Sequence, residues 1–224
     1  MSKKRIGVVL SGCGVQDGAE IHEAVLTLLA LDRAGAETIC MAPDREQMDV
    51  VDHRTGKPTG ERRNVLAEAA RIARGNIRDL ADVGAGDLDG VVLPGGYGAA
   101  KNLSTFARDG ASCQVEEGVA RLLRDMHQAG KPIAALCIAP AVLAALFGQS
   151  LHPEVTIGTD AGTAQALESM GARHRRAATT EVVVDRQHKL VTTPCYMTAT
   201  RISEVAIGAE RAVTELLKLA SPGA

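Results

Sequence analysis

One cysteine of the chain, Cys137, stands where a nucleophile can be held. It follows residues 132–136 (PIAAL), an apolar run that predicts a buried strand, and it precedes an alanine-rich run that predicts a helix. A thiol at such a turn lies beside the unpaired N–H groups of the helix, whose dipole stabilises a thiolate and lowers the pKa of the thiol. Cysteine is also a commonly buried residue type, so this turn alone fits a core thiol at least as well.

Two loops that contain glycines follow other predicted strands. Gly95 and Gly96 come directly after residues 90–93, so their backbone N–H groups can point into a crevice and stabilise an oxyanion; a tight turn with positive φ is the alternative. Residues 11–14 (SGCG) follow the first strand and open like a dinucleotide-binding fingerprint. Asp17 stands where that fingerprint needs its third small residue, so we expect no dinucleotide cofactor.

The elements that must position these residues alternate along the chain. Apolar runs that suit buried parallel strands occupy residues 6–10, 38–41, 90–93, 132–136 and 155–158. Helical periodicity occupies residues 20–33, 61–74, 115–128, 138–146, 161–170 and 203–219. We therefore predict an α/β fold with a doubly wound, mostly parallel sheet flanked by helices. The length of 224 residues fits one domain over residues 1–224.

Two segments depart from this alternation. Residues 180–193 contain two β-rich runs around a polar turn and predict an antiparallel hairpin at one sheet edge, and residues 48–63 predict a second small β excursion. Ligands bind outside the carboxyl ends of the strands of an open parallel sheet, so the loops with Cys13, Gly95 and Cys137 are expected to meet there. Cys195 follows the hairpin and can approach the same crevice.

Composition excludes several classes of partner. The formal net charge is -2 with both signs interspersed, which gives no footprint for nucleic acid or an anionic membrane surface. No apolar run approaches the roughly 20 residues of a membrane span, and residues 1–5 lead into a strand without a cleavable apolar region, so we expect a cytoplasmic protein. Five dispersed cysteines without a C-x-x-C pair indicate neither disulfides nor a metal site.

These residues together resemble a known family. The segments that carry the resemblance are residues 11–14 (SGCG), 20–26 (EIHEAVL), 94–103 (PGGYGAAKNL), 137–140 (CIAP) and 192–194 (TTP). They resemble the PfpI-like superfamily, whose flavodoxin-like fold is shared with class I glutamine amidotransferase domains, and within it the bacterial ElbB-type members, which are described as glyoxalases.

The resemblance implies roles for individual residues. It implies that Cys137 is the nucleophile and that the Glu23 carboxyl contacts its sulfur, with Glu20, one helical turn earlier, as the competing carboxylate. Backbone N–H groups are then expected to hold the oxyanion. The residues expected to supply these donors are Gly95, Gly96 and Ile138, and those expected to line the site are Cys13, Glu20, Tyr97, Asn102 and Cys195.

The departure from the family pattern concerns histidine. Some members have histidine directly after the cysteine, where this chain has Ile138, and others have it about 20 residues downstream, where residues 157–159 contain none. His22 is adjacent to Glu23, but consecutive residues of a helix point about 100° apart. His152 belongs to a His-Pro-Glu triplet that lies too close behind Cys137 to match the amidotransferase base, and we interpret it as a loop feature.

The favoured hypothesis is a glyoxalase that needs no cofactor. A Cys137 thiolate would attack an aldehyde carbon of glyoxal or methylglyoxal, and Glu23 would move a proton between the two carbons. The expected partners are a small dicarbonyl substrate and a second copy of the chain in a homodimer. The alternative is a redox sensor or regulatory binding module in which Glu23 stabilises an oxidised Cys137 and enzyme activity is incidental. A protease or amidotransferase is less favoured without a positioned histidine. The resemblance also implies a link to isoprenoid biosynthesis.

Overall fold

A seven-stranded sheet forms the centre of the computed structural model, which describes residues 3–221. Its strands lie in the order β10-β11-β7-β6-β1-β2-β5, and every neighbouring pair is parallel except β10 with β11. The strands span Arg5–Val9 (β1), Glu37–Ala42 (β2), Arg78–Asp79 (β5), Gly90–Leu93 (β6), Ile133–Leu136 (β7), Val183–Asp185 (β10) and Leu190–Thr193 (β11). The predicted mostly parallel sheet with an antiparallel hairpin at one edge is therefore confirmed.

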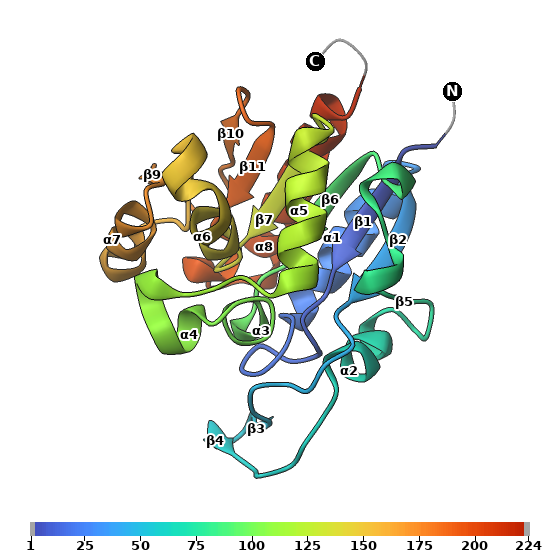
Figure 1. Cartoon of the computed structure of the whole chain (residues 1–224), viewed down its shortest axis with the longest axis vertical. Coiled ribbons are helices and arrows are strands. Elements are labelled where there is room, and N and C mark those ends of the chain that lie inside the picture. The colour runs from blue at the N-terminus through green and yellow to red at the C-terminus, as the bar shows by residue number, and fades with distance from the viewer. Residues whose placement is uncertain (1–2, 222–224) are drawn as a thin grey trace.

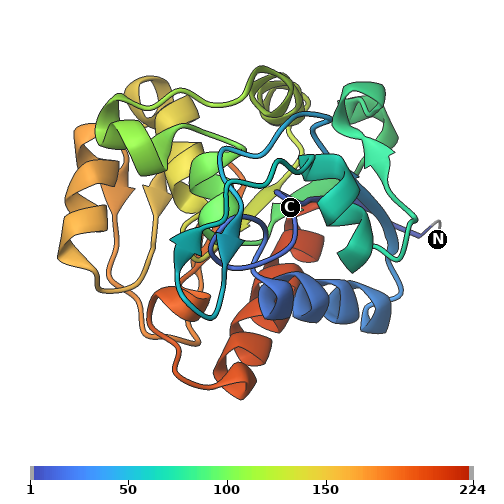
Figure 2. The same ribbon diagram turned by 90° about the horizontal axis from the view of Figure 1, so that it is seen from below.

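Helices cover both faces of this sheet (Figures 1 and 2). The central strands β6 and β7 are buried at every position, which is why they appear in the sequence as continuous apolar runs. One face packs against α1 (Ile21–Arg33), α2 (Val65–Ile72) and α8 (Ile202–Leu219). The other packs against α3 (Tyr97–Lys101), α5 (Glu117–Gln128) and α6 (Pro140–Leu151), with α4 (Phe106–Asp109) and α7 (Ala161–Ser169) beside them.

The prediction that residues 155–158 form a fifth parallel strand of the main sheet is wrong. Residues 155–158 supply only part of β8 (Glu154–Val155), which pairs in parallel with β9 (Arg173–His174) in a separate two-stranded sheet. Val155 and Ile157 are buried against α6 and α7 and not in the central sheet. An apolar run predicts burial, but it does not specify which neighbour buries it.

Smaller elements complete the chain. The predicted β excursion is present as the antiparallel pair β3 (Val51–Asp52) and β4 (Lys57–Pro58). Helix α6 continues to Leu151, beyond the predicted end at residue 146, and stops where His152 adopts a left-handed conformation. Four short 3₁₀ helices span Leu80–Asp82 (η1), Ala85–Asp87 (η2), Gly110–Ser112 (η3) and Cys195–Met197 (η4).

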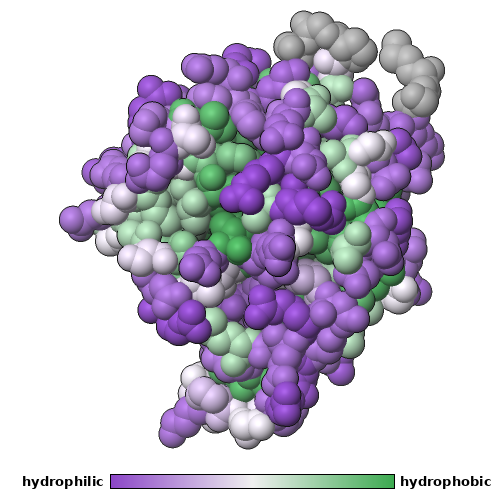
Figure 3. All heavy atoms as spheres, in the orientation of Figure 1, coloured by the Kyte–Doolittle hydropathy of each residue, from purple (hydrophilic) through white to green (hydrophobic). Residues whose placement is uncertain are grey.

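The face that carries α5 is mostly hydrophilic, with hydrophobic residues gathered beside α5 near α6 (Figure 3). Within residues 3–221, no helix combines the length and the apolar character that crossing a membrane requires.

Candidate active site

Cys137 is held on a sharp turn between β7 and α6. Its φ is 57°, in the left-handed region that side chains rarely occupy, and its backbone N–H donates to the Thr193 carbonyl at 3.0 Å. The side chain is only 8% exposed. The backbone N–H groups of Gly96 and Ile138 donate hydrogen bonds toward its sulfur. A strained turn that is fixed by a bond to the neighbouring strand is typical of a functional position.

Glu23 reaches the same sulfur from α1. The residue is fully buried, and its carboxyl group forms a hydrogen bond with Cys137. The two carboxyl oxygens also accept backbone N–H groups, from Gly95 to Oε2 at 2.8 Å and from Tyr196 to Oε1 at 3.0 Å. Glu20 holds a different place: its carboxylate caps α1 by accepting the Glu23 N–H at 2.7 Å. The carboxyl group at the thiol is therefore that of Glu23.

The consecutive glycines after β6 let the two reactive side chains approach. A Cβ atom on Gly95 would lie 2.3 Å from the Cys137 Cβ and 2.5 Å from the Glu23 Oε2, so only a residue without a side chain fits between them. Gly96 has a φ of 95°, and a Cβ there would lie 2.4 Å from the backbone N of Glu20 and 2.5 Å from the Gly18 carbonyl oxygen. The expected role of Gly95 as an oxyanion donor is wrong, because its N–H is used by Glu23 and the residue does not line the cavity beside Cys137. Gly95 serves close packing, and Gly96 serves both packing and the supply of an N–H donor toward Cys137.

Burial controls the protonation of the pair. Burial and the nearby Glu20 raise the pKa of Glu23 to about 7, against the backbone N–H groups, which lower it. Burial and the negative charge of Glu23 raise the pKa of the Cys137 thiol, although the N–H groups of Gly96 and Ile138 oppose this. The expected low thiol pKa is therefore wrong, because burial outweighs the helix dipole. Near neutral pH the Cys137 thiol keeps its proton, and the adjacent Glu23 carboxyl group can both accept and release a proton.

A cavity of about 430 Å³ opens onto Cys137. Its walls are mainly apolar, and its polar groups come from two tyrosines and the start of α7. The lining residues are Val15, Gly96, Tyr97, Ala100, Phe106, Ala107, Cys137, Ile138, Asp160, Thr163, Tyr196 and Met197. A second cavity of about 530 Å³ lies beyond α3, between Arg45 and Glu117, and does not include Cys137. The cavity that opens onto Cys137 is therefore the smaller of these two.

Several residues expected to line the site do not line this cavity. Cys13 is partly buried within the electrostatic influence of Glu68 and Arg71, and Cys195 is fully buried. Asn102 acts as a clamp: its Nδ2 donates to the carbonyl oxygens of Ser11 and Asp17, both at 2.8 Å, and its Oδ1 accepts the Met48 N–H at 3.0 Å. Of the five residues expected to line the site, Tyr97 is the one that lines the cavity.

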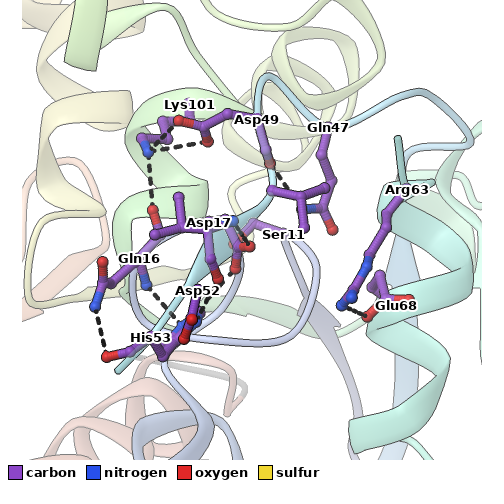
Figure 4. A network of polar contacts seen from close by, with 12 residues as sticks. Ser11, Gln16, Asp17, Gln47, Asp49, Asp52, His53, Arg63, Glu68 and Lys101 are labelled. Atoms are coloured by element: carbon purple, nitrogen blue, oxygen red, sulfur yellow. Dashed lines mark hydrogen bonds and ion pairs between the residues drawn. The ribbon is translucent and has the colours of Figure 1, made fainter. Parts of the chain in front are cut away.

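A polar network beside the site joins the β3–β4 excursion to the loop after β1 (Figure 4). The Nζ of Lys101 donates to the Gln16 carbonyl at 2.9 Å and to both oxygens of Asp49, at 2.8 and 3.0 Å. Asp17 accepts the Val51 N–H at 2.8 Å. These bonds fix the loop that places Val15 in the wall of the cavity.

Tyr196 lies at the candidate site, although the sequence did not point to it. It follows β11, which pairs in parallel with β7 so that Thr193 lies opposite Leu136. The residue lines the cavity, its backbone N–H donates to Glu23, and its hydroxyl lies 2.7 Å from the Nδ1 of His22. The signal that could have found it is its distance of three residues from a strand adjacent to β7. Within residues 3–221, no cluster of three or more metal-binding side chains occurs.

Known proteins resemble the chain over most of its length. The chain is 49% identical over 225 residues to the human glutamine amidotransferase-like class 1 domain-containing protein 3, mitochondrial, covering 96% of this chain and 83% of that protein. It is 48% identical over 227 residues to the ES1 protein homolog, mitochondrial, of Rattus norvegicus, covering 97% of this chain and 84% of that protein.

A solved structure agrees with these relatives. The crystal structure of an isoprenoid biosynthesis protein with an amidotransferase-like domain from Ehrlichia chaffeensis superposes with a TM-score of 0.89 at 36% identity. The match covers 96% of this chain and 99% of that one. The predicted amidotransferase-like fold and its ElbB-type resemblance are thereby confirmed.

The expected cytoplasmic location is contradicted by the curated relatives, which are named as mitochondrial proteins. The expectation depended on finding no apolar secretion signal, and that criterion does not bear on mitochondrial import, whose signals are amphipathic. The model of the DJ-1/PfpI family matches residues 13–200. The chain belongs to the DJ-1/PfpI family.

Proposed function

We propose that the protein is a glutathione-independent glyoxalase that converts glyoxal, and also methylglyoxal, to the corresponding 2-hydroxy acid. The observation that carries the proposal is the buried contact between the Cys137 thiol and the Glu23 carboxyl group, whose pKa of about 7 suits proton transfer at neutral pH. A base with such a pKa supplies what histidine would otherwise provide.

The proposed reaction begins with addition of the thiol to one aldehyde group. A bond forms between the sulfur and C1, the C1 oxygen becomes a hydroxyl, and Glu23 takes the thiol proton and passes it to that oxygen. Glu23 then removes the hydrogen from C1 while the C2 oxygen gains a proton, which forms an enediol. Glu23 returns the hydrogen to C2 as the C1 hydroxyl loses its proton, so that in sum the hydroxyl proton has moved from the C1 oxygen to the C2 oxygen and a thioester of the 2-hydroxy acid remains. Water cleaves the thioester, so the sum is one dicarbonyl plus one water to one hydroxy acid, without an external oxidant or reductant.

The charge of the cavity supports an uncharged substrate. Among the described residues that line the cavity, none is lysine, arginine or histidine, whereas Asp160 supplies a carboxylate. Hydrogen bonds from Thr163 lower the pKa of Asp160, so it stays ionised at neutral pH. An anionic oxo acid would meet this charge without a compensating cation, and an anionic product would be repelled.

The redox-sensor alternative receives less support from this geometry. Oxidation by peroxide needs a thiolate in the resting protein, and burial raises the pKa of the Cys137 thiol. Carbonyl addition can start from the neutral thiol, because Glu23 accepts its proton as the carbon–sulfur bond forms. The structure therefore favours the enzyme as the working hypothesis.

The test measures glycolate formation from glyoxal in glutathione-free buffer. We expect Cys137→Ala to reduce the rate to that of buffer and Glu23→Gln to reduce kcat by about 10²- to 10⁴-fold, the usual contribution of general acid–base catalysis. Cys113→Ala is the matched control, since this thiol lies outside the cavity and contacts Met170. Undiminished glycolate formation by Cys137→Ala would contradict the proposal.

A further inference from the structure

Tyr196 is fixed at both ends beside the reactive pair. Its backbone N–H donates to the Glu23 Oε1 at 3.0 Å, and its phenol oxygen lies 2.7 Å from the Nδ1 of His22. His22 and Glu23 are consecutive in α1, so they leave the helix in different directions and hold opposite ends of one tyrosine. Tyr196 is also one of the residues that line the Cys137 cavity.

The phenol group keeps hydrogen-bonding capacity for a ligand. A tyrosine hydroxyl has one donor and two acceptor sites, and His22 uses one of them. When the Nδ1 of His22 carries the proton and donates it, the phenol O–H is free to donate to an oxygen in the cavity. Partial burial and the carboxylates of Glu20 and Glu23 raise the pKa of Tyr196, so the phenol retains its proton at neutral pH.

We propose that Tyr196 is a catalytic hydrogen-bond and proton donor to the carbonyl oxygen at C2 of the substrate, and that His22 is the residue that positions its hydroxyl. This inference rests on the proposed glyoxalase function. It assigns the second half of the proton transfer, because Glu23 moves the proton between the carbon atoms and gives none to the C2 oxygen as its charge develops.

The proton balance closes within the site. As Glu23 removes the C1 hydrogen, Tyr196 gives its proton to the C2 oxygen, and the N–H of His22 stabilises the resulting phenolate. When Glu23 returns the proton to C2, the phenolate takes the proton from the adjacent C1 hydroxyl, which becomes the thioester carbonyl. In a cis-enediol the two oxygens are neighbours, so one phenol can reach both. The tyrosine ends the cycle in its starting form.

The experiment compares Tyr196→Phe with the wild-type protein in the glyoxal assay. Phenylalanine keeps the ring and the backbone N–H on Glu23, so the variant removes the hydroxyl alone. We expect kcat to fall by about 10- to 100-fold, at or below the usual range for one acid–base group, while KM changes by less than about threefold. Cys137 should retain its rate of alkylation by iodoacetamide, because its surroundings are unchanged.

The role of His22 is tested by rescue. His22→Leu should lower kcat as Tyr196→Phe does, whereas His22→Asn, whose amide can replace the ring nitrogen as a hydrogen-bond donor, should restore at least about a third of the wild-type kcat. His127→Leu is the matched control, a histidine at the end of α5 that contacts Phe147 outside the cavity.

The outcomes separate this inference from the proposed function. A wild-type protein that forms no glycolate would remove both. An active wild-type protein with an equally active Tyr196→Phe, or a variant altered only in KM, would overturn the inference and leave the glyoxalase proposal in place. Equal loss in His22→Leu and His22→Asn would overturn the positioning role of His22.

Discussion

Gly95 lies between the thiol and the carboxyl group, and its missing side chain allows their contact. In Gly95→Ala the new Cβ would lie 2.3 Å from the Cys137 Cβ, so one of the two reactive residues must move. We expect a loss of glycolate formation of at least about 10²-fold and a loss of unfolding free energy of about 1–3 kcal/mol from overpacking.

Gly86→Ala is the matched control for this substitution, because a Cβ there would meet no atom within 4 Å. Its activity should equal that of the wild-type protein, and its stability should change by less than about 0.5 kcal/mol in urea unfolding. A fully active Gly95→Ala would show that the contact between Cys137 and Glu23 is unnecessary.

At the scale of single residues, the sequence predicted the site residues that either follow the end of a strand or belong to a motif shared with the family. Cys137, Glu23 and Gly96 were found in this way, and the structure brings them together. Asn102 lies in the same motif as Gly96, but its amide is used to join loops. Proximity in sequence to a glycine turn does not show where a side chain points. The raised pKa of the Cys137 thiol could not be predicted from the sequence either, because it depends on how much of the folded protein covers the sulfur.

At the scale of elements, Lys101 fixes the β3–β4 excursion to the body of the protein. Lys101→Met would remove the bonds to Gln16 and Asp49, so we expect faster hydrogen exchange and proteolysis in residues 49–60. The global midpoint in urea should change little, since the central sheet is untouched. Lys57→Met, in exposed β4, is the control. Unchanged exchange in Lys101→Met would show that other contacts, such as the bond from Val51 to Asp17, are sufficient.

The strands and helices were predicted where their patterns are local. The continuous apolar runs of β6 and β7 indicate strands buried on both faces, and both were found. No single apolar run predicts which strands are neighbours in the sheet. The placement of β11 beside β7 carries Tyr196 to the site, and this pairing joins residues more than 50 positions apart in sequence. Residues 155–158 also show that a run does not specify its partner, since Val155 pairs in β8 with β9 and not with the central sheet.

At the scale of the whole molecule, Glu23 couples stability to pH. Its pKa rises from 4.5 in the unfolded chain to about 7 in the folded protein, so between these values the folded state binds more protons than the unfolded state. The stability contribution is complete below about pH 4.5 and is lost as the pH rises through 7. The loss amounts to about 3 kcal/mol of unfolding free energy.

Glu23→Gln removes this titration, so urea unfolding between pH 5 and 8 should show a smaller decline than in the wild-type protein. His174, whose pKa is lowered by burial, is present in both proteins and cancels in the comparison. Glu37→Gln, at the exposed start of β2, should follow the wild-type curve. Parallel curves for Glu23→Gln and the wild-type protein would contradict the assigned pKa.

The homodimer expected from the sequence stays a prediction, as does the small dicarbonyl partner. Helix α1 exposes Ile21, Val25 and Leu29 at one-turn intervals, with exposed fractions of 43%, 47% and 39%. The same helix carries Glu23 on its buried side and His22 next to it. Helix α1 therefore exposes an apolar surface and also supplies residues to the candidate site.

The contact of Gly96 with the loop before α1 has a consequence for how the sequence can change over time. A side chain at Gly96 would meet backbone atoms of Gly18, Ala19 and Glu20. In a hydrophobic core, an enlarged residue can be accommodated when its neighbour becomes smaller in a second mutation. The three atoms nearest to such a side chain are all backbone atoms, so a smaller neighbouring side chain would relieve none of these contacts. We therefore expect this position to accept no larger residue through stepwise substitution.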